Sequence, residues 1–236
     1  LGLLRRGRTL LLMGFSTLVV YWLQPESSVF GSLSFWLPTL TIFITVLAWV
    51  ITVPPGSRSL RANLPAVIVL FCVIVFVVFG SRLPGLDLPE PGSYRLVAGA
   101  LVVMSALVAG LFLVKKGERF LMPVAALALI AIFVFLKSPW VSERAFSLLA
   151  SLRGRTLDST VPVNIAWLGY SYIAFRLLHT IRDRQSGVLP AVGLAEYINY
   201  VIFFPAFTAG PIDRLERFIV ELREPLPLRN ADWLFS

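Results

Sequence analysis

Repeated apolar runs of nearly membrane-spanning length constrain this chain more than any other feature. A helix that crosses a bilayer needs about 20 mostly apolar residues. The segments that approach this length are Thr9–Leu23, Leu33–Val53, Leu64–Gly80, Leu96–Val114, Phe120–Leu136, Val161–Ile181 and Leu194–Ala209. We therefore expect an all-α, polytopic membrane protein with about seven embedded segments and additional interfacial amphipathic helices.

The composition supports this fold class and excludes several functions. Hydrophobic residues make up 57% of the 236 residues and charged residues 14%, whereas soluble domains contain about 25% charged residues. The net charge is +8, but the basic residues lie in short loops between apolar runs, which indicates membrane topology and lipid contact rather than a nucleic-acid partner. The single cysteine and single histidine exclude an intramolecular disulfide and a His-rich metal site, so we expect no bound metal.

The positive-inside rule orients the first five segments. With the N-terminus inside, the outside loops hold only Arg82 and Arg95. The basic residues of the inside segments are Arg5, Arg6, Arg8, Arg58, Arg61, Lys115, Lys116 and Arg119. After Leu136 this bias disappears, and the mixed stretch Ser138–Thr160 predicts an interfacial amphipathic helix followed by a polar loop. We accordingly divide the chain into N-terminal transmembrane helices with an interfacial segment (1–160) and a core segment (161–236).

A polar stripe marks the sixth and seventh segments. Its members are Ser171, Tyr172, Arg176, His179, Asp183 and Glu196. Four of them are spaced 4, 3 and 4 residues apart from Tyr172 onward, which places them on one helix face. An arginine in an apolar span usually faces a partner or a water-filled path. The stripe either lines a substrate tunnel or forms a structural network in which Arg176 pairs with an acid such as Glu196.

A sharp corner follows the seventh segment. Pro205 should kink or end the helix, and after Gly210-Pro211 the apolar residues return at helical spacing, which predicts a short amphipathic helix. Asp213 would lie near the positive end of that helix and could pair with Arg217 four residues later. The residues assigned to this corner are Pro205, Gly210, Pro211, Asp213, Arg214 and Arg217.

The stretch from Gly169 to Phe218 resembles the central region of the membrane-bound O-acyltransferase family. It is most similar to the branch that moves D-alanine onto teichoic acids, and next to the branch that acetylates alginate and other exopolysaccharides. The features that carry the resemblance are Gly169, Ser171-Tyr172, Phe175-Arg176, Arg182-Asp183, Gly187-Val188-Leu189, Glu196, Phe204-Pro205, Thr208, Gly210-Pro211-Ile212-Asp213-Arg214 and Arg217-Phe218. They cover roughly a fifth of the chain.

The resemblance implies a ring of membrane helices crossed by a tunnel in the bacterial cytoplasmic membrane. An acyl thioester donor, either an acyl carrier protein or acyl-CoA, would approach from the cytoplasmic face and an acceptor hydroxyl from the other face. No covalently bound cofactor is expected. A histidine in the tunnel would act as general base.

In the family this histidine lies downstream of the corner, so the resemblance places it after Ser236 and assigns no catalytic residue within this chain. His179 is not promoted to that role, because no motif fixes an acid or a nucleophile beside it. The chain would then be the N-terminal half of an acyltransferase, completed by further sequence or by a second polypeptide. The alternative is a non-catalytic scaffold subunit of a larger membrane complex.

Overall fold

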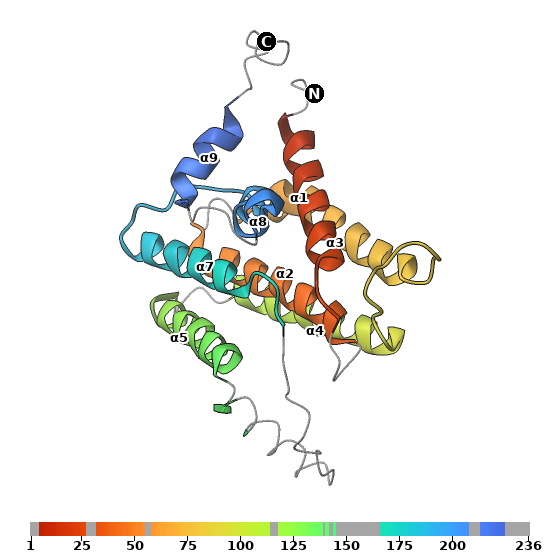
Figure 1. Ribbon diagram of the computed structural model, residues 1–236. Coiled ribbons are helices and arrows are strands. Elements are labelled where there is room, and N and C mark those ends of the chain that lie inside the picture. The colour runs from red at the N-terminus through yellow and green to blue at the C-terminus, as the bar shows by residue number, and fades with distance from the viewer. Residues whose placement is uncertain are drawn as a thin grey trace, which may run out of the picture.

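A computed structural model describes residues 5–26, 32–54, 58–113, 118–138, 140–141, 144, 166–207 and 213–224. Within these ranges every regular element is helical (Figure 1), which confirms the predicted all-α class for the described residues. The elements are α1 (Arg5–Trp22), α2 (Leu33–Thr52), α3 (Leu60–Gly80), α4 (Tyr94–Leu113), α5 (Glu118–Lys137), α7 (Tyr170–Gln185), α8 (Leu194–Ile202), the 3₁₀ turn η2 (Phe204–Ala206) and α9 (Leu215–Arg223).

Four of the described helices are long and apolar enough to cross a membrane, which makes this a membrane protein. The apolar stretches are Leu33–Thr52 in α2, Arg61–Gly80 in α3, Tyr94–Phe112 in α4 and Phe120–Lys137 in α5. The α2 stretch is 61% buried, whereas those of α4 and α5 are 6% and 11% buried. Helix α2 therefore lies inside the bundle, and α4 and α5 present apolar outer faces suited to lipid.

The expected number of about seven spans is corrected to four among the described residues. Helix α1 is not among these four, and three of its 18 residues are arginines. The sixth predicted span becomes α7, which has 16 residues and is therefore about 24 Å long. The seventh becomes α8, which has nine residues and is about 14 Å long. Both are shorter than the hydrocarbon core of about 30 Å.

Local breakers explain why the last two segments are short. Gly169 has a left-handed backbone and precedes the first residue of α7, while residues 161–165 of the predicted span lie outside the described residues. Helix α8 ends at Ile202, and Pro205 lies in the 3₁₀ turn η2, which confirms that this proline lies where the helix stops. Of the predicted interfacial stretch, only Ser138, residues 140–141 and residue 144 are described.

Helix α8 is the buried centre of the second half. It contacts α1, α2, α3, α7 and α9, and Figure 1 shows it between α1 and α7. Residues 197 to 202 are all buried, including the aromatic side chains of Tyr197 and Tyr200. A helix that other helices surround in this way is held by packing rather than by its own length, since isolated helices below about 12 residues are marginal.

The start of α7 is fitted against the turn that follows α8. Gly169 has φ of 68°, a conformation that only glycine adopts without strain. A Cβ atom at this position would lie 2.7 Å from Cζ of Phe207, whose side chain is buried. Nearby, the Trp167 indole N–H donates a 2.9 Å hydrogen bond to Oγ1 of Thr41 in α2. The entry to α7 is thus locked by both backbone geometry and packing.

We predict that Gly169→Ala destabilises the protein more than Gly187→Ala. Gly187 has φ of 73°, but a Cβ atom added there would meet no atom within 4 Å, whereas at Gly169 it would clash with Phe207. Backbone strain should lower the free energy of unfolding of both variants by about 1–3 kcal/mol. The clash with Phe207 should lower it further in Gly169→Ala alone. Thermal unfolding in detergent measures the difference, and equal melting temperatures for the two variants would contradict the packing argument.

Candidate functional site

The residues with predicted functional roles gather around α8. A nine-residue helix buried on several sides leaves up to four N–H groups and four carbonyl groups unsatisfied at its two ends. In lipid or protein interior these groups need partners, because an unpaired buried polar group costs free energy. Polar side chains of α7, of α3 and of α8 itself supply partners for several of them.

Arg176 occupies the C-terminal end of α8. Its Nη1 atom donates to the carbonyl oxygens of Tyr200 at 2.7 Å and of Val201 at 3.2 Å. The side chain is 4% exposed, and its guanidinium carbon lies 5.6 Å from the centroid of the Tyr200 ring. A cation at this position satisfies two orphan carbonyl groups and meets the negative end of the helix dipole.

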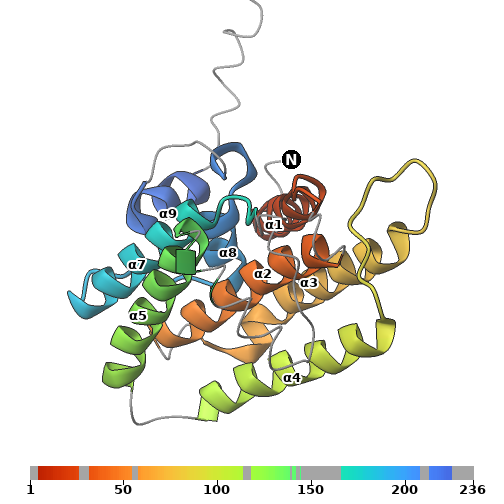
Figure 2. The ribbon, with the colours of Figure 1, turned by 60° about the horizontal axis from the view of Figure 1, so that its bottom comes forward.

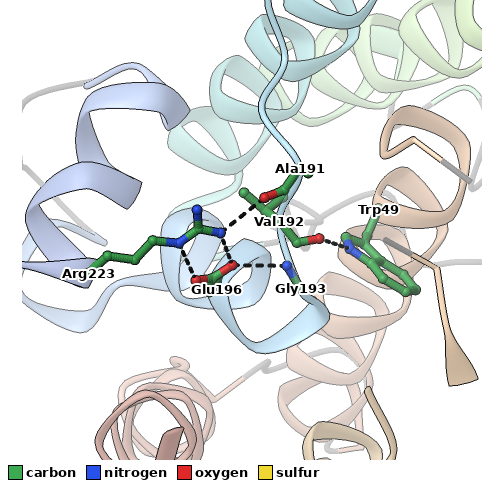
Figure 3. Close-up of polar contacts among 6 residues, drawn as sticks. All are labelled: Trp49, Ala191, Val192, Gly193, Glu196 and Arg223. Carbon is green, nitrogen blue, oxygen red and sulfur yellow. Dashed lines mark hydrogen bonds and ion pairs between the residues drawn. The ribbon is translucent and has the colours of Figure 1, made fainter. Parts of the chain in front are cut away.

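This geometry corrects the predicted pairing of Arg176 with Glu196. Glu196 instead binds Arg223 of α9, with 2.8 Å from Nε to Oε1 and 2.8 Å from Nη2 to Oε2 (Figure 3). The physical reason is distance along the helix: Glu196 belongs to the first turn of α8, whereas Arg176 reaches the last turn. A bidentate arginine–carboxylate pair of this kind is among the stronger charged hydrogen bonds.

Glu196 also caps its own helix. Its Oε2 atom accepts a 2.9 Å hydrogen bond from the backbone N–H of Gly193, and Arg223 donates further to the carbonyl oxygen of Ala191 at 3.0 Å. Burial raises the pKa of Glu196, but hydrogen bonds from Arg223 and Gly193 and the charge of Arg223 lower it below its ordinary value overall. The carboxylate therefore remains ionised and holds α9 onto the start of α8.

Two further side chains at the N-terminal end of α8 were not singled out from the sequence. Oδ1 of Asn63 in α3 accepts a 2.7 Å hydrogen bond from the backbone N–H of Leu194, 131 residues away. Trp49 of α2 donates from Nε1 to the carbonyl oxygen of Val192 at 3.2 Å (Figure 3). An asparagine at the start of the apolar α3 is the sequence signal that could have indicated such a cap.

Polar contacts also fasten the middle of α8. The Tyr197 hydroxyl lies 2.8 Å from Oγ1 of Thr180 in α7. Nδ2 of Asn199 donates to the carbonyl oxygen of Thr9 in α1 at 2.8 Å, and the Tyr200 hydroxyl donates to the carbonyl oxygen of Asp213 at 2.9 Å. Each contact joins α8 to a different segment, so the helix is fixed in rotation as well as in position.

The other members of the predicted stripe lie along α7. Ser171, Tyr172, His179 and Asp183 are all half-buried on that helix. Nδ1 of His179 is buried and has no hydrogen-bond partner within the described part of the chain. No acid pairs with it there, so the described geometry provides no catalytic dyad. Whether the stripe lines a tunnel stays a prediction.

The corner residues are only partly described. Gly210 and Pro211 lie outside the described residues. The predicted amphipathic helix exists as α9, but it begins at Leu215, with Arg214 as its N-cap and Asp213 before it. Nε of Arg217 lies 3.7 Å from Oδ2 of Asp213 and 3.1 Å from Oε1 of Glu221. The first of these contacts confirms the predicted pairing of Asp213 with Arg217. These pairs are exposed and contribute little stability.

The described polar residues of this site form a structural frame, by which we mean the contacts that hold α7, α8 and α9 together. Over the ranges that the structure covers, no group of three or more His, Cys, Asp or Glu side chains could hold a metal ion. The charged residues Arg176 and Glu196 are engaged with backbone groups and with Arg223. The frame fixes the relative positions of α7, α8 and α9, and therefore of any reacting groups attached to these helices.

Comparison with known proteins gives partial matches to one kind of enzyme. A 52-residue segment is 44% identical to a teichoic acid D-alanyltransferase of Streptococcus thermophilus, covering 22% of this chain and 12% of the relative. Segments of 68 and 56 residues are each 36% identical to the teichoic acid D-alanyltransferases of Lacticaseibacillus rhamnosus and Bacillus subtilis. The chain resembles the teichoic acid D-alanyltransferases.

The resemblance predicted from the Gly169–Phe218 motifs is thereby confirmed. The matched segments span 12%, 17% and 14% of the three teichoic acid D-alanyltransferases. No family model matches the chain, and no solved structure matches it. Each match therefore covers less than a third of this chain and less than a fifth of the relative.

We predict that Arg176→Leu destabilises the protein strongly while Arg182→Leu on the same helix does not. Removing the guanidinium leaves the buried carbonyl groups of Tyr200 and Val201 without their donor, at about 1–3 kcal/mol for each. Arg182 is exposed and serves as the matched control. Thermal unfolding in detergent tests this.

Arg176→Lys should rescue only part of the lost stability, because an ammonium group does not reproduce the planar fork of a guanidinium. Equal melting temperatures for Arg176→Leu and Arg182→Leu would show that the contact between Arg176 and α8 is dispensable.

The Glu196 carboxylate should make stability depend on pH. Because its pKa is lower in the folded protein, it stabilises the fold above the ordinary glutamate pKa of about 4.3. This contribution is lost as the pH falls through the lower, folded-state pKa. The melting temperature of Glu196→Gln should therefore lie below that of the unmodified protein at pH 7, and the two should converge below about pH 4.

Glu216→Gln is the control for this measurement, because Glu216 is exposed on the first turn of α9. Its melting curve should follow that of the unmodified protein at every pH. A difference between Glu196→Gln and the unmodified protein that stays constant down to about pH 3 would contradict the assigned ionisation.

Proposed function

We propose that this chain is part of an O-acyltransferase of the teichoic acid D-alanylation type in a bacterial cytoplasmic membrane. The observation that carries the proposal is the 44% identity over 52 residues with a teichoic acid D-alanyltransferase. The four apolar helices support it, because they provide the membrane setting that transfer to an extracytoplasmic polymer requires.

The proposed reaction moves an acyl group, D-alanyl by this resemblance, from a thioester to a hydroxyl. The hydroxyl oxygen of the polymer attacks the thioester carbonyl carbon, so that a carbon–oxygen bond forms and the carbon–sulfur bond breaks. A general base accepts the hydroxyl proton, and the thiol of the donor is released. The donor, an acyl carrier protein or acyl-CoA, would approach from the cytoplasmic side and the polymer from the opposite side.

Within this reaction we assign the described residues a positioning role. Arg176 holds α7 to the end of α8, and the Glu196–Arg223 pair holds α9 to its start. Catalysis depends on such fixed geometry, since small displacements of reacting groups lower rates by large factors. We assign no proton transfer to His179.

A non-catalytic scaffold subunit is the second candidate, and one observation favours it. The charged side chains predicted to line a tunnel, Arg176 and Glu196, are occupied by backbone groups and by Arg223. This is what a packing frame without chemistry would also require. The two candidates differ in whether the intact protein transfers acyl groups in the absence of other subunits.

Two measurements on the intact protein test the proposal. Deleting its gene in the source bacterium should remove alkali-labile D-alanyl esters from the cell-envelope polymer, and the unmodified gene should restore them. The purified protein in lipid should then transfer labelled D-alanine from a thioester donor to a polyol acceptor. Unchanged ester content after deletion would contradict the proposal. Lost esters without transfer by the purified protein would favour the scaffold.

A further inference from the structure

An apolar groove lies between α5 and α7. Its volume is about 580 Å³, and it is open to the outside. This volume lies in the range of sites that bind small molecules, about 300–1,000 Å³. Its lining residues are Pro123, Ala126, Leu127, Ile130, Leu178, Ile181, Arg182 and Gln185.

The walls of the groove are suited to a hydrocarbon chain. Leu127 is 68% exposed and Ile130 is 47% exposed, so a helix long and apolar enough to cross a membrane presents large apolar side chains to its surroundings at this position. Opposite them, Leu178 and Ile181 form the apolar wall on α7. Among the described residues that line the groove, the polar side chains are those of Arg182 and Gln185, both near the end of α7.

The polar end of the groove lies at the inner side of the membrane by the positive-inside rule. Helices α5 and α7 lie side by side and run antiparallel (Figures 1 and 2), so the end of α7 lies with the start of α5. The start of α5 follows the basic sequence Lys115-Lys116, which the rule places inside. The cytoplasmic leaflet is the one whose anionic lipids attract basic side chains.

Arg182 is available for a ligand. It is exposed, and no described side chain forms an ion pair or hydrogen bond with its guanidinium group. A guanidinium group binds phosphate through paired N–H donors. A groove with apolar walls and an arginine of this kind at its aqueous end is complementary to an amphiphile that has a long acyl chain and an anionic phosphate head.

We propose that the groove between α5 and α7 binds an anionic phospholipid of the inner leaflet, with one acyl chain between the two helices and the phosphate on Arg182. The proposal is independent of the acyltransfer reaction. It assigns a ligand to Arg182, which the frame around α8 leaves unused, and it gives the exposed apolar face of α5 a defined neighbour.

Fluorescence quenching by labelled lipids in membranes tests the occupant. The intact protein carries Cys72→Ser and a single fluorophore on either Leu127→Cys, in the groove, or Val102→Cys, on α4; both native side chains are 68% exposed. The quencher is a nitroxide on the acyl chain of phosphatidylglycerol or of phosphatidylcholine. Phosphatidylglycerol should quench more than phosphatidylcholine at Leu127→Cys, and the two lipids should quench equally at Val102→Cys.

Two substitutions test separately the contributions of the phosphate head group and of the acyl chain to lipid binding. Arg182→Gln should weaken the apparent affinity for phosphatidylglycerol about fivefold, the effect of one basic group at an anionic membrane surface, whereas Arg95→Gln, which removes an exposed arginine from α4, should not. Ala126→Trp should fill the groove and abolish the preference. Native mass spectrometry of the same variants, with phosphatidylglycerol titrated into detergent, gives the affinities.

Three outcomes would overturn the proposal. Equal quenching by both lipids at Leu127→Cys would show that the groove does not select an anionic head. Protection of Leu127→Cys from both quenchers, with Val102→Cys still quenched, would show that polypeptide fills the groove. An equal loss of affinity in Arg95→Gln and Arg182→Gln would show that only the net charge of the protein matters.

Discussion

The hydrogen bonds from Arg176 to the end of α8 are the interaction on which the second half of this protein depends. A nine-residue helix cannot bury its side chains among five neighbours unless its terminal carbonyl groups also find donors. A single guanidinium group supplies two of these bonds from α7. The arginine meets the negative end of the helix dipole, and the carboxylate of Asp213 also interacts with it electrostatically.

The opposite end of α8 uses separate groups for the same purpose. Asn63 accepts from the Leu194 N–H, and Glu196 accepts from Gly193 while it binds Arg223. These contacts tie α3 and α9 to one short helix, so the N-terminal helices and the C-terminal amphipathic helix share a single anchor. Such a frame would hold reacting groups in place in an acyltransferase, and it would equally suit a scaffold.

Burial divides the polar residues of α7 into two sets. Arg176 and Thr180 are buried and form hydrogen bonds with α8, while Nε of Arg176 has no partner within the described residues. Arg182 lies on an exposed part of the helix beside the apolar face of α5. The first arginine is therefore a structural cation and the second is available to the surroundings. Two arginines six residues apart on one helix thus serve different purposes, because only one of them meets the end of a buried helix.

The sequence alone determined the helical class, four of the apolar spans, the end of α8 before Pro205 and the resemblance to teichoic acid D-alanyltransferases. These features rest on local signals: hydrophobic runs, helix breakers and a motif of contiguous residues. The sequence did not show that the last two apolar segments form helices too short to span a membrane, because hydropathy does not indicate where a helix begins or ends. The spacing predicted the Asp213–Arg217 pair within one segment, but pairing between distant segments was decided only by the tertiary structure. Arg176 binds carbonyl groups and Glu196 binds Arg223, because contacts between distant segments depend on how helices cross, and spacing along the chain carries no information about that.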